Sequence, residues 1–285
     1  MGFEFLQCGK KIRVECMQVE SLIEHGTGAL NEDYLLMEGN LFGVFDGATS
    51  LSSQTYENGR TGGFLASSLA GEEFRKNHGT MEELAKRANM VIRKEMAQRN
   101  VDLENKHDLW STSAAVVRIR GELMEWAQIG DCRIVCVYEN GDFDFVCQCP
   151  DQDLETLSMW KDVGQSTDEP IGVALHEQIS KVRCRMNLDY GVFNGEPEAI
   201  DFLQSGKLDL SGVRNVLLFT DGLLLPNENP WEERDFSTQV DLFLQSGLKG
   251  LRDHIRSIEA TDLGCRLYPR FKTHDDIAAV AISIC

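Results

Sequence analysis

The chain is poor in proline and in basic residues. Its 285 residues include 6 prolines, and 28 Lys and Arg stand against 46 Asp and Glu, which gives a formal net charge of −18. Binding of nucleic acid draws its sequence-independent affinity from clustered cations that neutralise phosphates. Because the sequence contains no basic run of that kind, nucleic acid is not expected as a partner.

Long apolar runs are also missing. The stretch from Val213 to Leu225 is interrupted by Arg214, Asn215 and Asp221, whereas a membrane span needs about 20 apolar residues. The first ten residues lack the apolar centre of a signal peptide. We therefore expect no membrane partner and a cytoplasmic location.

The cysteines show no regular spacing. Their number, nine, is odd, which argues against a disulfide framework. Cys147 and Cys149 are separated by one residue, whereas zinc ligands usually have two to four residues between them. We interpret all nine as reduced thiols, most of them in the core.

The remaining composition is that of an ordinary globular protein, with 42% hydrophobic, 26% charged and 8% aromatic residues. No repeat or linker is visible, so we expect one domain over residues 1–285. The connections Arg120-Gly121-Glu122 and Glu139-Asn140-Gly141-Asp142 predict two hairpins, and with them an antiparallel meander from Ser113 to Cys147. Further strand-like runs are rich in β-branched and apolar residues and lie at Lys11–Val19, Tyr34–Met37, Leu41–Phe45, Val213–Phe219 and Ile277–Ile284.

Helical patterns lie between these strand-like runs. The pattern over Met81 to Gln98 is the clearest, because Thr80 and Glu83 form a capping-box sequence in front of apolar residues at helical spacing. Weaker helical patterns occur at Gln54–Phe74, Leu154–Trp160, Ser237–Leu244 and Leu248–Ile258. Antiparallel strands separated by a pair of helices predict the α+β class.

Acidic residues stand where the expected strands begin or end. They are found in Asn31-Glu32-Asp33, Asp46-Gly47, Gly130-Asp131, Asp221-Gly222 and Asp275-Asp276. Two carboxylates about 4 Å apart repel by about 4 kcal/mol at an effective dielectric near 20, so their convergence would require bound cations. Oxygen ligands favour Mg²⁺ or Mn²⁺ over zinc. Taken singly, however, each Asp-Gly pair is better explained as a turn.

The order of six short motifs resembles the metal-dependent protein phosphatases of the 2C type, of which the chain would be a divergent, bacterial-like member. The motifs are Asn31-Glu32-Asp33, Phe42–Gly47, Ser111–Ala114, Ile129–Arg133, Leu218–Leu223 and His274–Ile277. The resemblance implies a central antiparallel β-sandwich flanked by helices, in four αββα layers. It also implies a site for two Mg²⁺ or Mn²⁺ ions at one end of the sandwich, with a third, weaker metal position beside them.

The resemblance also implies roles for individual residues. Asp46 would bridge the two metals and the Gly47 carbonyl would coordinate one of them, while Asp221 and Asp275 would hold the other. Glu32 and Asp33 would act mainly through water, and Asp131 would help to hold the third ion. By this carry-over Asp46, Asp221 and Asp275 are the catalytic set, and water would attack the phosphoester directly.

Three positions depart from the family pattern. Gly28 stands where the phosphate-binding Arg is usual, Ala48 where many members have His, and Ala278 where Thr is frequent. Metal binding should survive these changes, so we expect retained but modest activity. Candidates for a substitute phosphate contact are Arg60, His25 and Arg133, and the spacing favours none of them.

The resemblance places a flap beside the active site at about residues 168–208, a segment that is rich in glycine and contains Glu196 and Glu198. A decorative loop there is an equally good reading. We expect His107 and Asp108 to form a surface turn and His274 to lie next to a metal ligand.

The first functional hypothesis is a metal-dependent phosphatase acting on phosphoserine or phosphothreonine in proteins, with a cognate kinase as a candidate partner. The alternative is a pseudophosphatase or regulatory module that binds metal or a partner with little turnover, prompted by Gly28, Ala48 and Ala278. A weaker third option is a phosphatase of small phosphoesters.

Overall fold

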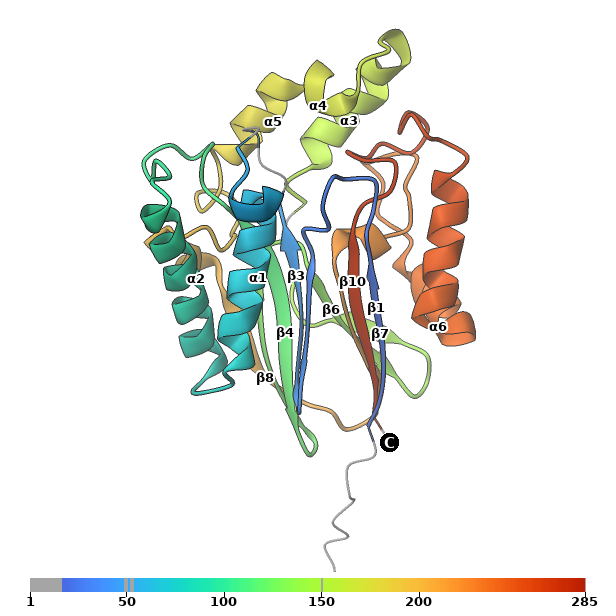
Figure 1. The fold of residues 1–285 in the computed structure, drawn as a ribbon. Coiled ribbons are helices and arrows are strands. Elements are labelled where there is room, and N and C mark those ends of the chain that lie inside the picture. Colours follow the sequence, from blue (N-terminus) through green and yellow to red (C-terminus); the bar gives the residue numbers. More distant parts are fainter. Residues whose placement is uncertain (1–16, 49–50, 52–53, 150, 285) are drawn as a thin grey trace, which may run out of the picture.

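Two antiparallel five-stranded sheets packed face to face form the centre of the protein (Figure 1). The computed structural model describes residues 17–48, 51, 54–149 and 151–284. The first sheet has the order β1 (Gln18–Glu24), β10 (Ile277–Ser283), β9 (Val213–Phe219), β6 (Arg133–Tyr138) and β7 (Phe143–Phe145). The second has the order β2 (Tyr34–Glu38), β3 (Leu41–Gly47), β4 (Thr112–Arg120), β5 (Leu123–Ile129) and β8 (Gln204–Asp209).

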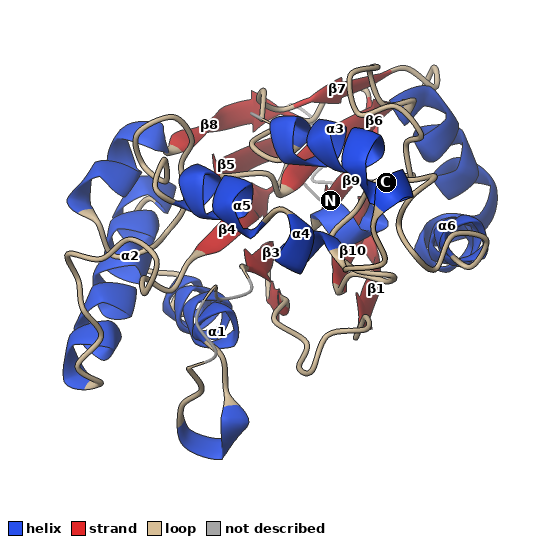
Figure 2. Ribbon diagram, turned by 90° about the horizontal axis from the view of Figure 1, so that it is seen from above, coloured by secondary structure: helices blue, strands red, loops and turns tan. Residues whose placement is uncertain are grey.

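Helices cover both outer faces of the sandwich, so the predicted four-layer αββα architecture is confirmed. Helices α1 (Gly62–Arg75) and α2 (Met81–Gln98) pack on the second sheet, and α6 (Phe236–Glu259) packs on the first (Figure 1). Three shorter helices, α3 (Leu154–Val163), α4 (Ile171–Ala174) and α5 (His176–Arg183), lie across one end of the sandwich (Figure 2).

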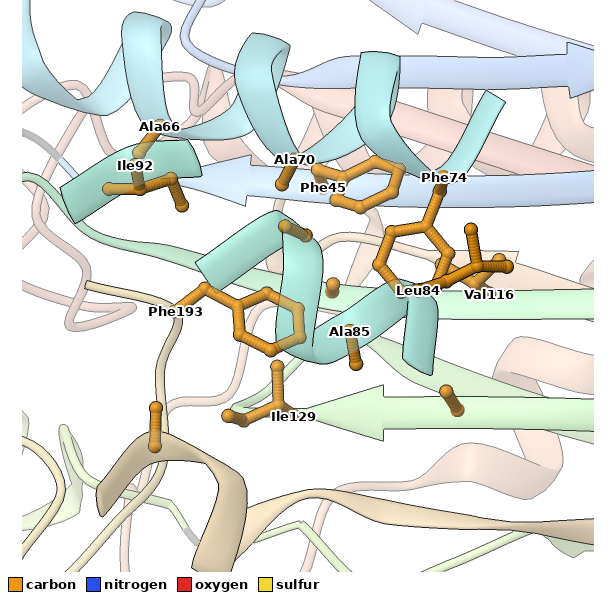
Figure 3. Packing of buried hydrophobic residues seen from close by; sticks show 14 of the residues in the cluster. Phe45, Ala66, Ala70, Phe74, Leu84, Ala85, Ile92, Val116, Ile129 and Phe193 are labelled. Carbon is orange, nitrogen blue, oxygen red and sulfur yellow. The ribbon is translucent and has the colours of Figure 1, made fainter. Parts of the chain in front are cut away.

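The central strands are buried on both faces. In β3, Phe42 and Val44 point between the sheets, while Leu41 and Phe45 point toward the helices, as the period of two in a strand requires. Figure 3 shows Phe45 packed against Phe74 of α1, with ring centroids 5.6 Å apart. The ends of such doubly packed strands are held rigidly, which suits them to carry site residues.

Helix α2 begins and ends where the sequence predicts. The Thr80 hydroxyl accepts the Glu83 amide at 3.1 Å, and the Glu83 carboxylate accepts the Thr80 amide at 2.9 Å. Both hydrogen bonds of the capping box are therefore formed. The break expected between the two C-terminal helical segments is also present, because Gly247 adopts φ 70° inside α6.

The prediction of one continuous meander from Ser113 to Cys147 is wrong. Both hairpins form, but β5 belongs to the second sheet and β6 to the first. The chain crosses from one sheet to the other at residues 130–132, and Gly130 turns there with φ +76°. This crossing places Asp131 at the end of the sandwich instead of in a strand.

Two other element predictions need correction. The helix expected from Gln54 begins at Gly62, after the N-cap Thr61. Strand β8 was not predicted, because its sequence, Gln204 to Asp209, is polar and contains Gly206. It forms an exposed sheet edge, where packing demands little apolar surface.

The structure describes the cysteines and the first expected strand only in part. The described cysteines are free, and Cys132, Cys136 and Cys265 are buried. Cys8, Cys16 and Cys285, and most of the strand expected at Lys11–Val19, fall outside the described residues. Within the described part of the chain, no helix has the length and apolar character needed to cross a membrane.

Candidate active site

The sandwich end beneath α3, α4 and α5 gathers the acidic side chains that stand at strand termini. Asp46 ends β3, and Asp131 lies in the β5–β6 crossing. Asp221 follows β9, and Asp275 precedes β10. All four line one cavity of about 370 Å³. Residues up to 229 positions apart in the sequence are thus brought to a single site.

The carboxylates of this cavity perturb the pKa of one another. Burial raises the pKa of Asp46 well above its usual range, and the charges of Asp33 and Asp221 raise it further. Burial likewise raises the pKa of Asp221, and so does the charge of Asp275. A hydrogen bond between Asp221 and the Asp46 carboxyl acts in the opposite direction. The metal-free cavity therefore favours protonated carboxyls.

Asp33 lies near Asp46 and is fixed by Thr220, the residue that follows β9. Its Oδ2 accepts the Thr220 hydroxyl at 2.7 Å, and the same hydroxyl oxygen accepts the Ala278 amide at 2.9 Å. Burial raises the pKa of Asp33, the Thr220 bond lowers it and the charge of Asp275 raises it. Thr220 thus provides a hydroxyl next to Ala278, which has none. Because Thr220 directly precedes Asp221, the sequence could have suggested this role.

Glu32 does not line the cavity. Its carboxylate accepts the Thr61 hydroxyl at 2.5 Å, and its amide donates to the Asp276 carboxylate at 2.9 Å. Asp276 also accepts the amide of Gly26 at 2.7 Å. Glu32 and Asp276 therefore tie the loop before β2 to α1 and to the start of β10, which holds Asp33 in place.

The sequence analysis missed Lys272, which lies in the cavity wall beside Asp275. Its ammonium contacts the Asp275 carboxylate at 2.7 Å. Burial alone would lower the pKa of Lys272, but the charges of Asp275, Asp276 and Asp46 raise it. Lys272 therefore stays cationic and offsets part of the negative charge. It stands three residues before Asp275 and two before the His274–Ile277 motif, so its place next to that motif could have suggested it.

The chain that enters α3 approaches the cavity from the other side. Asp131 accepts the Ser113 hydroxyl at 2.6 Å and also the Gln152 amide. The Gln152 Oε1 atom is buried and has no hydrogen-bond partner among the described residues. The pKa of the neighbouring Asp153 is raised to about 7, chiefly by burial and then by the charge of Asp131, while Arg183 acts in the opposite direction. These residues extend the acidic surface toward α3.

The donor set fits hard divalent cations. It consists of half-buried carboxylates that raise the pKa of their neighbours, and carboxylate oxygens prefer Mg²⁺ or Mn²⁺. Glycine permits the backbone of Asp46-Gly47 to come close, because a Cβ at Gly47 would lie 2.4 Å from the Gly63 carbonyl oxygen. Within the described residues, no three His, Cys, Asp or Glu side chains are already arranged around a common point as a metal site. The carboxylates form a cluster, and not a preformed coordination shell.

Helices α3, α4 and α5, which we call the lid (residues 154–183), cover this end of the sandwich (Figure 2). The flap predicted at 168–208 overlaps the lid only in part, because the lid begins at Leu154 and residues 204–208 lie in β8. Arg183, at the last position of α5, reaches into the cavity wall.

None of the residues suggested as substitute phosphate contacts lines the 370 Å³ cavity. The His25 ring bonds the Gly28 carbonyl oxygen at 2.9 Å, and Arg60 lies over the Phe64 ring. Arg133 lies over the rings of Phe145 and Phe236 and lines a smaller neighbouring cavity of about 90 Å³, which shares Asp131, Asp221 and Asp275 with the larger one.

Neither His107 nor His274 lines the cavity. The His107 ring contacts the exposed thiol of Cys184 at 3.3 Å, and Asp108 accepts the Asn105 amide. His274 bonds Glu259 at 2.7 Å, so it is a neighbour of Asp275 that faces α6.

Comparisons with known proteins agree with this geometry. Residues 24–166 match the family model described as protein phosphatase 2C, and no curated protein matches the chain. The serine/threonine phosphatase PstP/Ppp of Mycobacterium tuberculosis is similar in structure at 16% identity and a TM-score of 0.58, over 94% of this chain and 98% of that one. A structure of the PstP catalytic domain with two manganese ions has 15% identity and a TM-score of 0.58, with the same coverage. The serine/threonine phosphatase Stp1 of Staphylococcus aureus has 13% identity and a TM-score of 0.57, with full coverage of both chains. At these identities the solved structures show a shared fold.

Proposed function

The chain belongs to the protein phosphatase 2C family, and from this premise we propose that its acidic cavity hydrolyses phosphoserine and phosphothreonine esters in proteins with two Mg²⁺ or Mn²⁺ ions. Metal-dependent phosphoprotein hydrolysis is the activity of the family. The observation that supports this site is the convergence of Asp46, Asp131, Asp221 and Asp275 on one cavity at the end of the sandwich.

The proposed division of labour follows the positions of the side chains. Asp46 and the Gly47 carbonyl, with Asp221 and Asp275, would hold the two ions. When bound, the ions supply the Lewis acidity that activates water and neutralises phosphoryl oxygens. Asp131 would contribute to a third, weaker position, because it faces the same cavity.

The residues behind the cavity support these ligands. Asp33, held by Thr220, would orient Asp46 and act through water. Glu32, bound to Thr61, would act through the backbone that carries Asp33. Because rigid support of a site improves its geometry, loss of either should weaken activity less than loss of Asp46.

A phosphopeptide assay with Mn²⁺ tests the proposal. The wild-type chain should release phosphate, and Asp221→Ala should abolish release because it removes a ligand from the cavity. Asp241→Asn is the matched control, since Asp241 is an exposed carboxylate on α6 and its loss should leave turnover unchanged. A metal-loaded wild type that hydrolyses no phosphoester would contradict the proposal and favour the binding-module alternative.

The location and the partners are also proposals. We infer a cytoplasmic protein that acts on phosphorylated proteins and is opposed by a kinase. A comparison of a phosphopeptide with p-nitrophenyl phosphate would separate this reading from a phosphatase of small phosphoesters, because the latter should show no preference for the peptide.

A further inference from the structure

We propose that Arg183, from the lid, is the residue that binds the substrate phosphate in this chain, in the role that Gly28 leaves empty. The inference rests on the proposed function and concerns the same cavity. Arg183 is 155 residues from Gly28 in the sequence, and it was not among the candidates that the sequence suggested.

The position of the Arg183 guanidinium supports this role. It lines the cavity together with Asp46, Gly47 and Asp221, and its Nη1 donates to the Ser111 hydroxyl at 3.1 Å. Ser111 is buried, and its carbonyl oxygen accepts the Ala48 amide at 3.0 Å. The guanidinium is thereby held close to Ala48, which directly follows the Asp46-Gly47 backbone that would hold the metals.

The charges in the cavity leave few groups for an anion. Among the described lining residues, the arginines and lysines are Arg183 and Lys272. Lys272 is engaged with Asp275 at 2.7 Å, and Arg183 is bonded to Ser111, whose carbonyl oxygen accepts the Ala48 amide. A guanidinium also presents two parallel N–H donors to a phosphate, which an ammonium cannot. Arg183 is therefore the group best suited to a phosphoryl oxygen pair.

The first experiment measures phosphate binding in the Mn²⁺-loaded protein by calorimetry, together with KM and kcat for a phosphopeptide. Arg183→Met should weaken inorganic phosphate binding and raise KM by about tenfold or more, because a charge-assisted pair is lost. Arg183→Lys should recover part of this loss, since it restores the charge without the two-pronged geometry. The matched control is Arg185→Met, because Arg185 pairs with Asp189 on the outer surface, and it should leave both values unchanged.

A second variant separates phosphate binding from a tether between the lid and the sandwich. Ser111→Ala removes the hydroxyl that anchors Arg183 but keeps the guanidinium and its contact with phosphate, so phosphate affinity should fall by no more than about threefold. Equal losses in Ser111→Ala and Arg183→Met would overturn the inference and identify a tether. Thermal unfolding of each variant reports whether the fold is intact.

The outcomes distinguish this inference from the proposed function. Wild-type turnover with unchanged phosphate binding in Arg183→Met would overturn the inference and leave the function standing. Absence of turnover with phosphate binding that depends on Arg183 would overturn the function and support the inference. Absence of both turnover and phosphate binding would overturn both.

Discussion

Replacement of Asp46 by Asn should make the metal-free protein more stable and the metal-loaded protein less stable than the wild type. Asp46 is half-buried beside Asp33 and Asp221, whose charges raise its pKa, and it shares a hydrogen bond with Asp221. The amide of an Asn at this position can still donate to Asp221, so the substitution removes charge while keeping shape and the hydrogen bond.

The magnitude follows from the contact between the two carboxyl groups. Hydrogen-bonded carboxyls place their charges about 4 Å apart, where full repulsion would be about 4 kcal/mol at an effective dielectric of 20. Because one shared proton relieves part of this repulsion, we expect Asp46→Asn to stabilise the metal-free chain by about 1–3 kcal/mol. In a chain of this size each kcal/mol raises the Tm by about 2–4 °C.

Metal should reverse the order. Mn²⁺ at a hundred times its Kd would stabilise the wild type by about 2.7 kcal/mol, whereas Asp46→Asn lacks the proposed bridging ligand and should gain little. The assay is thermal unfolding at pH 7.5, once with EDTA and once with Mn²⁺, with Asp241→Asn as control. An Asp46→Asn protein that is less stable than the wild type in EDTA would refute the claim that the carboxylates repel one another.

Three further predictions concern the same chain. In EDTA the free energy of unfolding should fall as the pH rises above about 4, the ordinary pKa of Asp. The reason is that carboxyls with raised pKa hold more protons in the folded than in the unfolded state. Urea titrations at pH 5 and 8 should show this fall, and a fall of the same size in Asp46→Asn would count against it. Lys272→Met should tighten Mn²⁺ binding by about fivefold, because Mn²⁺ would no longer have to displace the Lys272 ammonium from its pair with Asp275, which is worth about 1 kcal/mol. Calorimetry that shows weaker Mn²⁺ binding would contradict this. Thr80→Ala removes the N-cap of α2 and should cost about 1 kcal/mol without changing phosphatase activity, and a loss of turnover at full folding would be inconsistent with its purely structural place.

Local signals predicted much of the fold. The helix from Met81 to Gln98 is confirmed at both ends because its start is encoded by Thr80 and Glu83, whose bonds lie within one turn. The hairpins at Gly121 and Gly141 are confirmed for the same reason, since both glycines adopt positive φ. Features that depend on packing far along the chain were not predictable, such as the change of sheet between β5 and β6 and the polar edge strand β8.

The candidate site was predictable in its acidic part and not in its basic part. Asp46, Asp131, Asp221 and Asp275 stand at strand ends, where the fold brings them together. Arg183 ends a short helix with no motif of its own. Its relation to Ser111 exists only in three dimensions, so no spacing in the sequence could have indicated it.

The central claim is that these distant carboxylates form one site for a pair of hard divalent cations. A crystal structure of the chain grown with Mn²⁺, with anomalous scattering measured at the manganese edge, tests it most directly. We predict two anomalous peaks in the cavity, each within coordination distance of Asp46 and one of them also near Asp221 and Asp275. Peaks elsewhere on the protein, or an empty cavity at saturating Mn²⁺, would contradict the account.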